Sequence, residues 1–311
     1  MITKEAEDKI TNNYDIVFCN AARTGFEHLL KNLRLGKKKI LMPAYIGETD
    51  SDGSGVFEPI RNTKTGYDFY SVSRKLAPDM GEIEEKLKSG NYGALFIIHY
   101  FGFPQCNPAE ARTLCDKHKV IFIEDCAHTW CSEINGKRLG TFGHFSIFSI
   151  HKLVAAGGGG FLLRNKPMKM GPLEEKKKIS SGDMLQFFTS NWEKINSIRI
   201  RNYKYLLNAL HAEKMINIMY PKLEPGVVPL NFPILVKKNL REKVYFRMID
   251  KGVITIALYY RLISEIPASK FPDSAEVSNS ILNLPVHQDI TLEDLGKIVN
   301  ALKQSLKELS N

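Results

Sequence analysis

Asp125 and Lys152 are the two residues whose types and positions could do chemistry together. Asp125 ends the apolar stretch "VIFIED", and Lys152 follows "FSIFSIH" and precedes four consecutive glycines at 157–160. A carboxylate at the end of a buried strand costs free energy unless a cation or an N–H group meets it. We therefore predict a positively charged partner for Asp125, which a structural salt bridge or a bound cationic ring would each satisfy.

The order of Lys152 and the glycines narrows the choice of ligand. A phosphate-binding P-loop places its glycines before its lysine, and the dinucleotide fingerprint G-x-G-x-x-G follows a strand; neither pattern occurs here. Pyridoxal phosphate (PLP) chemistry uses both residue types, because a carboxylate keeps the pyridine nitrogen protonated and a lysine carries the cofactor covalently. The pair therefore favours PLP, with a surface lysine beside a flexible loop as the alternative.

The cysteines and histidines indicate no metal site. Cys126, His128 and Cys131 form a C-x-H-x-x-C pattern, but the second ligand pair of a usual zinc site is missing. The five cysteines are an odd and sparse set for 311 residues, which indicates reduced thiols rather than disulfides. We predict no bound metal and a reducing compartment.

The composition is that of an ordinary globular protein, 43% hydrophobic and 25% charged. No apolar stretch approaches the roughly 20 residues of a membrane-spanning helix, and the charged start "MITKEAEDKI" lacks the apolar centre of a secretory signal. We therefore predict a cytoplasmic protein without a membrane partner. The net charge of +9 is spread along the chain, which argues against a nucleic-acid partner and suits a phosphorylated small molecule.

Apolar strands alternate with helical patterns in the first half of the chain. Because continuous runs of Ile, Val and Phe are typical of strands buried on both faces, the alternation predicts a mostly parallel sheet and an α/β fold. Ligands bind beyond the carboxyl ends of such strands. The expected strands span residues 15–20, 38–45, 92–102 and 120–128, and the expected helices span 23–33 and 107–118.

The pattern changes after the glycines. Residues 166–178 are rich in lysine and contain two prolines, which indicates a loop or a boundary. Three helical patterns and one strand-like stretch follow, at residues 191–211, 240–252 and 292–309 and at residues 227–236. We therefore predict a large α/β domain at residues 1–190 and a small C-terminal α+β domain at residues 191–311.

Residues 122–160, "FIEDCAHTWCSEINGKRLGTFGHFSIFSIHKLVAAGGGG", resemble the core motif of the DegT/DnrJ/EryC1/StrS sugar aminotransferases. Shorter resemblances follow in the family's order, at "AARTGF", "ILMPAY", "HYFGFPQ" and "NLPVHQDITLEDLGKIVNAL". The resemblance implies a PLP-dependent enzyme of fold type I, whose three-layer large domain contains a mostly parallel sheet. It also implies a homodimer with its sites near the interface.

The resemblance gives Lys152, Asp125 and His128 the central roles. Lys152 would hold the cofactor covalently and later move a proton during catalysis. Asp125 would bind the pyridine nitrogen, and His128 would orient the ring through its phenolic oxygen. A satisfied core histidine is the alternative for His128.

The resemblance also implies a binding site for the cofactor phosphate. Ser149 would donate to the phosphate, together with the backbone N–H groups at the helix start around Arg23 and Thr24. Tyr45 and His99 are expected in the wall of the cofactor site. Ser149 has an alternative role, as a buried serine bonded to the backbone.

The resemblance implies transfer of an amino group from an amino acid, expected to be L-glutamate, to a keto-sugar, expected to be nucleotide-linked, in amino-sugar or surface-polysaccharide biosynthesis. Two features leave other functions open. Gly158 stands where the family usually has glutamate, and the residues between Asn165 and Asn191 are too few for a segment that reaches the neighbouring subunit in typical members. A PLP-dependent sugar dehydratase and a PLP-binding homologue with little transaminase activity are therefore the alternatives. Dehydratase relatives replace the lysine by histidine, and this chain keeps Lys152.

Overall fold

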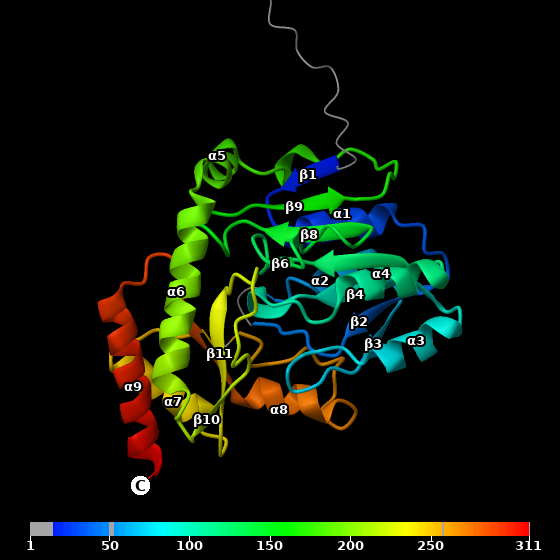
Figure 1. Ribbon diagram of the computed structural model, residues 1–311. Coiled ribbons are helices and arrows are strands. Elements are labelled where there is room, and N and C mark those ends of the chain that lie inside the picture. Colours follow the sequence, from blue (N-terminus) through cyan, green and yellow to red (C-terminus); the bar gives the residue numbers. More distant parts are fainter. Residues whose placement is uncertain (1–14, 50–52, 257, 311) are drawn as a thin grey trace, which may run out of the picture.

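A computed structural model describes residues 15–49, 53–256 and 258–310 of the chain. Within them, seven strands form a large sheet in the order β1-β9-β8-β5-β4-β2-β3 (Figure 1). β9 is antiparallel to β1 and β8, and the other paired strands are parallel. This arrangement confirms the α/β class and the mostly parallel sheet. The strands span Asp15–Cys19 (β1), Lys39–Pro43 (β2), Tyr67–Tyr70 (β3), Tyr92–Ile98 (β4), Ile121–Asp125 (β5), Phe145–Ser149 (β8) and Gly160–Arg164 (β9).

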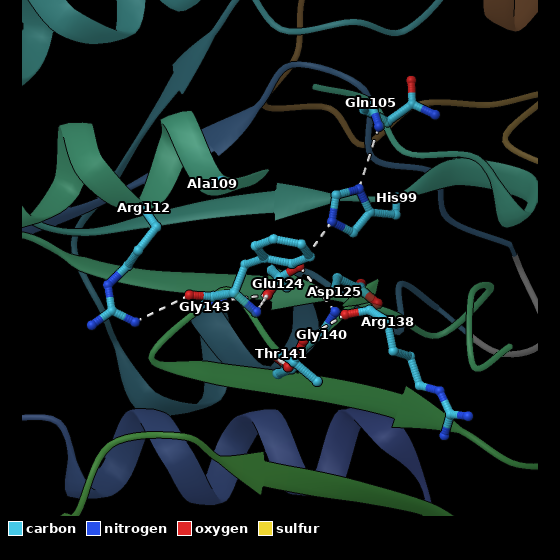
Figure 2. A network of polar contacts seen from close by, with 12 residues as sticks. His99, Gln105, Ala109, Arg112, Glu124, Asp125, Arg138, Gly140, Thr141 and Gly143 are labelled. Atoms are coloured by element: carbon cyan, nitrogen blue, oxygen red, sulfur yellow. Dashed lines mark hydrogen bonds and ion pairs between the residues drawn. The ribbon is translucent and has the colours of Figure 1, made fainter. Parts of the chain in front are cut away.

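Helices pack on this sheet because each has an apolar face. In Ala22–Asn32 (α1), the residues Phe26, Leu29 and Leu30 recur at helical spacing and are buried. α1 contacts β1, β8 and β9, and Pro108–Lys117 (α4) contacts β5. Figure 2 shows strands of the sheet between α4 and the blue helix α1. Two further helices of this half span Glu58–Thr63 (α2) and Met80–Lys88 (α3).

A second, antiparallel sheet has the strand order β10-β11-β12. α6 contacts β11 and α9, and α7 contacts β12 and α9, so these helices cover the small sheet (Figure 1). The predicted boundary at residue 190 falls between Ser181–Thr189 (α5) and α6, and the division into two domains stays a prediction. The elements span Trp192–Leu210 (α6), Ile216–Ile218 (β10), Asn231–Val236 (β11), Arg241–Asp250 (α7), Pro272–Ser280 (α8), Ile281–Pro285 (β12) and Leu292–Ser310 (α9).

All five expected strands are shorter in the structure than the sequence predicts, and two of them show a clear cause. The strand expected at 92–102 ends at Ile98, because Phe101 and Gly102 have left-handed φ angles of 57° and 99° that a strand does not contain. The strand expected at 227–236 begins at Asn231, after Leu230 has donated its N–H to the Phe101 carbonyl oxygen at 2.7 Å. The turn after β4 therefore contacts the segment that leads into β11.

The loop or boundary predicted at residues 166–178 contains one short 3-10 turn, at Glu175–Lys177. α5 follows it, in a stretch for which the sequence analysis predicted no element. The strands Glu133–Ile134 (β6) and Lys137–Arg138 (β7) form a separate two-stranded ribbon. Among the described residues, no helix has both the length and the apolar character needed to cross a membrane.

Candidate active site

A cavity of about 430 Å³ lies at the carboxyl ends of β4, β5 and β8. Its walls include residues from the ends of these strands and from the start of α1. This is the edge at which parallel sheets bind their ligands. Five of the residues predicted from the sequence line it together, namely Lys152, Asp125, His128, Ser149 and Arg23.

Asp125 is a buried carboxylate at the end of β5. Its Oδ1 accepts a hydrogen bond from the Ala127 N–H at 2.9 Å. Burial raises the pKa of Asp125, and the Ala127 N–H and the positive charge of Lys152 oppose that rise. Among the described residues, no lysine or arginine nitrogen forms an ion pair with Asp125, so a cationic ligand that reaches this carboxylate would meet no competing partner at that distance.

Lys152 and His128 form a hydrogen-bonded pair, with Nζ 3.0 Å from Nε2. His128 Nδ1 accepts the N–H of Phe101 at 3.1 Å, so the neutral ring carries its proton on Nε2. Nε2–H therefore donates to Lys152 Nζ, which can accept only as an uncharged amine. Burial lowers the pKa of His128 well below its usual value, and Lys152 adds to that effect.

The surroundings of Lys152 favour the uncharged amine. Its side chain is exposed to solvent through the cavity, yet the protein atoms around it lower its pKa. The negative charge of Asp125 opposes this shift, and the positive charge of Arg23 reinforces it. An uncharged lysine amine is the form that attacks an aldehyde.

The turn after β4 fixes the state of His128. The left-handed conformation of Phe101 accompanies the hydrogen bond from its N–H to His128 Nδ1. Gly102 must be glycine, because it has a positive φ and a Cβ there would lie 2.4 Å from the Val228 carbonyl oxygen. The sequence analysis placed "HYFGFPQ" at the end of a strand. Its residue types do not predict the hydrogen bond from Phe101 N–H to His128 Nδ1.

A further part of the cavity lining suits an anion. Ser149 ends β8, with Oγ 3.3 Å from His151 Nδ1. α1 begins at Ala22 without a side-chain cap, and the first N–H groups of a helix attract anions. The Arg23 guanidinium forms an ion pair with Glu58 at 2.7 Å, so Arg23 is fixed at this rim.

Thr24, Tyr45 and His99 are not placed on the cavity, although the sequence resemblance put them at the cofactor. The Thr24 N–H donates to the Ala21 carbonyl oxygen at 3.1 Å, and Thr24 lines a separate pocket at the outer side of α1. The Thr24 N–H is thus already bonded within the first turn of the helix, and a role for it at the phosphate stays a prediction. His99 is fully buried beneath the strand ends.

Tyr45 lies behind the cavity wall rather than in it. It is fully buried, its hydroxyl has no hydrogen-bond partner among the described residues, and its ring packs 5.4 Å from that of Tyr259. Tyr259 itself lines the cavity. A Cβ at Gly47 would come within 2.6 Å of the Tyr259 ring, so the glycine permits this approach. Sequence reasoning missed Tyr259, which comes from a segment more than 200 residues after Gly47.

The buried carboxylate of Glu124, next to Asp125, is the centre of a hydrogen-bond network (Figure 2). Glu124 accepts N–H groups from Gly140 and Phe142, both at 3.0 Å, and from Gly143. It also contacts His99 Nε2 at 3.2 Å. The three N–H donors fasten the turn at 140–143 to β5, and His99 adds a contact from the end of β4, directly beside Asp125.

The same network explains the one grouping of metal-ligand side chains among the described residues. It consists of His99, Glu124 and Cys126, and Cys126 is its only member from the C-x-H-x-x-C pattern. The carboxylate lone pairs of Glu124 are occupied by its four donors. The cluster is therefore a hydrogen-bonded core that offers no carboxylate oxygen to an ion.

The residues present fit PLP on three counts. Lys152 is an amine beside a histidine N–H, Asp125 is a buried carboxylate without an ion-pair partner among the described residues, and an uncapped helix start lines the same cavity as Ser149. The fold is that of the PLP-dependent enzymes of fold type I, and these residues fit the cofactor that such enzymes bind.

Comparison with known proteins gives the family. The model of the DegT/DnrJ/EryC1/StrS aminotransferase family matches residues 65–175 and 189–303, and the chain belongs to this family. Its members are PLP-dependent aminotransferases. The structure of Spr1654 of Streptococcus pneumoniae in its PLP form has a TM-score of 0.79 at 14% identity, covering 94% of this chain and 87% of that one.

Two curated relatives have names that describe sugar chemistry. The GDP-perosamine synthase of Vibrio cholerae is 39% identical over 74 residues, which are 23% of this chain and 20% of the relative. The UDP-N-acetyl-3-dehydro-alpha-D-glucosamine 3-aminotransferase of Acidithiobacillus ferrooxidans is 22% identical over 239 residues, 68% of this chain and 64% of the relative. The chain thus spans less than two thirds of the length of either.

Proposed function

We propose that the protein is a PLP-dependent aminotransferase that moves an amino group from an amino acid, L-glutamate, to a nucleotide-linked keto-sugar in amino-sugar biosynthesis. The observation that carries the proposal is the hydrogen bond between Lys152 and His128 in the cavity that also contains Asp125. The names of the two relatives, which refer to GDP- and UDP-linked sugars, support the substrate class.

Each residue would act through an atom that the site already positions. When bound, PLP supplies a conjugated ring that accepts the electron pair released by proton removal. Asp125 would hold a proton on the ring nitrogen by its negative charge. His128 would donate Nε2–H to the ring oxygen, since Phe101 leaves it no other tautomer. Lys152 Nζ, as a neutral amine, would take up and return the transferred proton.

The glycine tract retains a carboxylate although Gly158 replaces the family's usual glutamate. Asp183 of α5 accepts the Gly157 N–H at 2.8 Å. The sequence resemblance makes the segment after the glycines shorter than in typical members. Through Asp183 this segment still binds the glycine tract that follows Lys152. This contact supports an active enzyme rather than a PLP-binding homologue without turnover.

Colour and covalent trapping test the proposal. We expect a yellow protein whose visible band is lost on borohydride reduction, with the cofactor then fixed to Lys152 in peptide mass spectra. Lys152→Ala removes the adduct, whereas Lys166→Ala, at an exposed position, keeps it. A reducible adduct in the Lys152→Ala protein would contradict the assignment.

Release of 2-oxoglutarate from L-glutamate, with a panel of nucleotide-linked keto-sugars as acceptors, tests the reaction. Sugar dehydration without any 2-oxoglutarate would instead favour the dehydratase alternative. A homodimer and a cytoplasmic location stay predictions from the sequence resemblance.

A further inference from the structure

A second cavity, of about 370 Å³, adjoins the first at Lys152. His128 and His151 also line both cavities. The remaining walls come from later parts of the chain, including Arg199 of α6, Asn231 at the start of β11 and Gln288 after β12. The volume lies within the usual range of about 300–1,000 Å³ for small-molecule sites. Lys152 therefore stands between the cofactor cavity and a second space.

Arg199 is a buried cation in this second space that lacks a carboxylate. Its side chain is 3% exposed, Nη1 donates to the Leu230 carbonyl oxygen at 3.2 Å, and Nη2 donates to the Leu153 carbonyl oxygen at 3.1 Å. Nε has no partner, and no carboxylate of the described residues forms an ion pair with the guanidinium. Burial lowers its pKa to about 10, so it remains charged at neutral pH.

A buried charge of this kind calls for an anion. The one acidic residue that lines the same cavity, Asp289, raises the pKa of Arg199 through its charge, but it forms no ion pair with Arg199 and contacts His287 at 3.3 Å. A guanidinium binds a carboxylate with matched geometry. Apolar residues such as Leu153 and Val154 surround the cation, which suits a compact ligand with a single anionic group more than a diphosphate.

We infer that Arg199 binds a carboxylate of the amino-acid donor in the second cavity, so that the donor nitrogen faces the Lys152 side. This inference rests on the proposed aminotransferase function, and it adds the recognition site for one of the two substrates.

A purely structural role for Arg199 makes a different prediction. Arg199 and Gln288 both donate to the Leu153 carbonyl oxygen, at 3.1 Å and 3.2 Å. If Arg199 only holds the segment at residues 151–156 (the lysine loop) in place, loss of Gln288 would weaken maleate binding as much as loss of Arg199 does. If the charge binds substrate, loss of Arg199 costs clearly more carboxylate affinity than loss of Gln288.

The test uses maleate, an unreactive dicarboxylate, and the PLP-loaded protein in isothermal titration calorimetry. Arg199→Gln keeps N–H donors for Leu153 but removes the charge, and we expect maleate to bind at least about tenfold more weakly. Arg199→Lys keeps the charge and should recover part of the affinity. Gln288→Leu removes the other donor to the Leu153 carbonyl oxygen and should cost clearly less maleate affinity than Arg199→Gln. Arg201→Gln, on the exposed side of the same helix, should stay within about twofold of the parent.

Three outcomes would overturn the inference. They are absence of maleate binding to the parent protein, equal loss in Gln288→Leu and Arg199→Gln, and unchanged affinity in both Arg199 variants. UDP provides the second arm: if Arg199→Gln weakens UDP and spares maleate, the anion is a diphosphate and the carboxylate assignment is wrong. Maleate binding that follows Arg199 without any 2-oxoglutarate release would instead keep the anion site and reject the proposed reaction.

Discussion

His128 and Lys152 show how a backbone group can set the chemistry of two side chains. The Phe101 N–H occupies His128 Nδ1, which leaves Nε2–H as the donor toward Lys152. The sequence resemblance predicted both side chains at the cofactor. The tautomer could not be predicted, because it depends on a left-handed residue in a turn formed by another segment.

Asp125 gives the first prediction at this scale. Asp125→Asn keeps an oxygen for the Ala127 N–H but loses the charge that would hold the ring nitrogen protonated. We expect the visible cofactor band to persist and the amino-transfer rate to fall by about 100-fold or more. Asp116→Asn, on the outer helix α4, serves as the control with the same change. Near-parental kcat in Asp125→Asn would show that the carboxylate has no electronic role.

His144 gives a pH-dependent prediction. Its Nδ1 accepts the Phe122 N–H at 2.9 Å, and burial lowers its pKa from 6.5 to about 4. The unfolded chain therefore binds the extra proton between pH 6.5 and 4, so stability falls as the pH drops through this window. The loss is on the order of 3 kcal/mol and is absent above pH 6.5.

Urea unfolding at several pH values tests this dependence. His144→Asn keeps an acceptor for the Phe122 N–H but cannot titrate, so its free energy of unfolding should fall less steeply than the parent's between pH 6.5 and 4. Parallel curves for the two proteins would exclude His144 as the source. Other histidines with lowered pKa values, such as His128, act in both proteins and cancel in the comparison.

At the scale of elements, the glycine tract joins the lysine loop to β9 and α1. A Cβ at Gly160 would lie 2.5 Å from Ala22 N and 2.6 Å from the Phe148 carbonyl oxygen, both rigid backbone atoms. At Gly157 the nearest atom is a side-chain oxygen of Asp183 at 3.5 Å, an ordinary contact. Two glycines of one tract thus have different structural requirements.

This difference predicts that replacing glycine by alanine lowers the free energy of unfolding at position 160 but hardly changes it at position 157. Gly160→Ala should push α1 away from β9 and lower the free energy of unfolding by about 1–3 kcal/mol. Gly157→Ala should change it by less than about 0.5 kcal/mol, because the added methyl group has room. Urea denaturation of both variants measures the contrast. Equal stability of the two variants would mean that the close packing of α1 on β9 is not required.

α5 shows which elements the sequence analysis could have found. Ser180 Oγ accepts the Asp183 N–H at 3.1 Å, a capping pattern of serine followed three residues later by an acid. That pattern precedes the apolar residues of α5, of which Phe187 is buried beside Trp130 and Trp192. The predicted loop or boundary ended at residue 178, and no element was predicted for the residues of α5. The local signal for this helix was present in the sequence but was not used.

For the whole molecule, the large sheet was predictable and the second cavity was not. Strands such as Tyr92–Ile98 are buried at every position, so their apolar runs can be read from the sequence alone. The second cavity depends on Leu153, Arg199, Leu230 and Gln288, which come from four separate segments. Periodicity describes each segment by itself and carries no information on where they meet.

The meeting of these segments leads to a prediction about cooperative unfolding. Leu153, next to Lys152, is bonded to Arg199 and Gln288, so the lysine loop connects the two sheets. A ligand held by Lys152 should therefore stabilise both sheets in one transition. PLP at 100 times its dissociation constant adds about 2.7 kcal/mol, which corresponds to a rise of roughly 3–5 °C in the unfolding temperature.

Thermal unfolding followed by far-UV circular dichroism measures this rise. Lys152→Ala should lose most of it, whereas pyridoxine phosphate, which lacks the aldehyde, should give the same small shift in both proteins. Gln288→Leu weakens the connection between the sheets without touching the first cavity, where it does not lie. We expect PLP to shift a single transition in the parent and a broader one in this variant. Two separate transitions in the parent, only one of them shifted by PLP, would mean that the sheets unfold independently and that the lysine loop does not couple them.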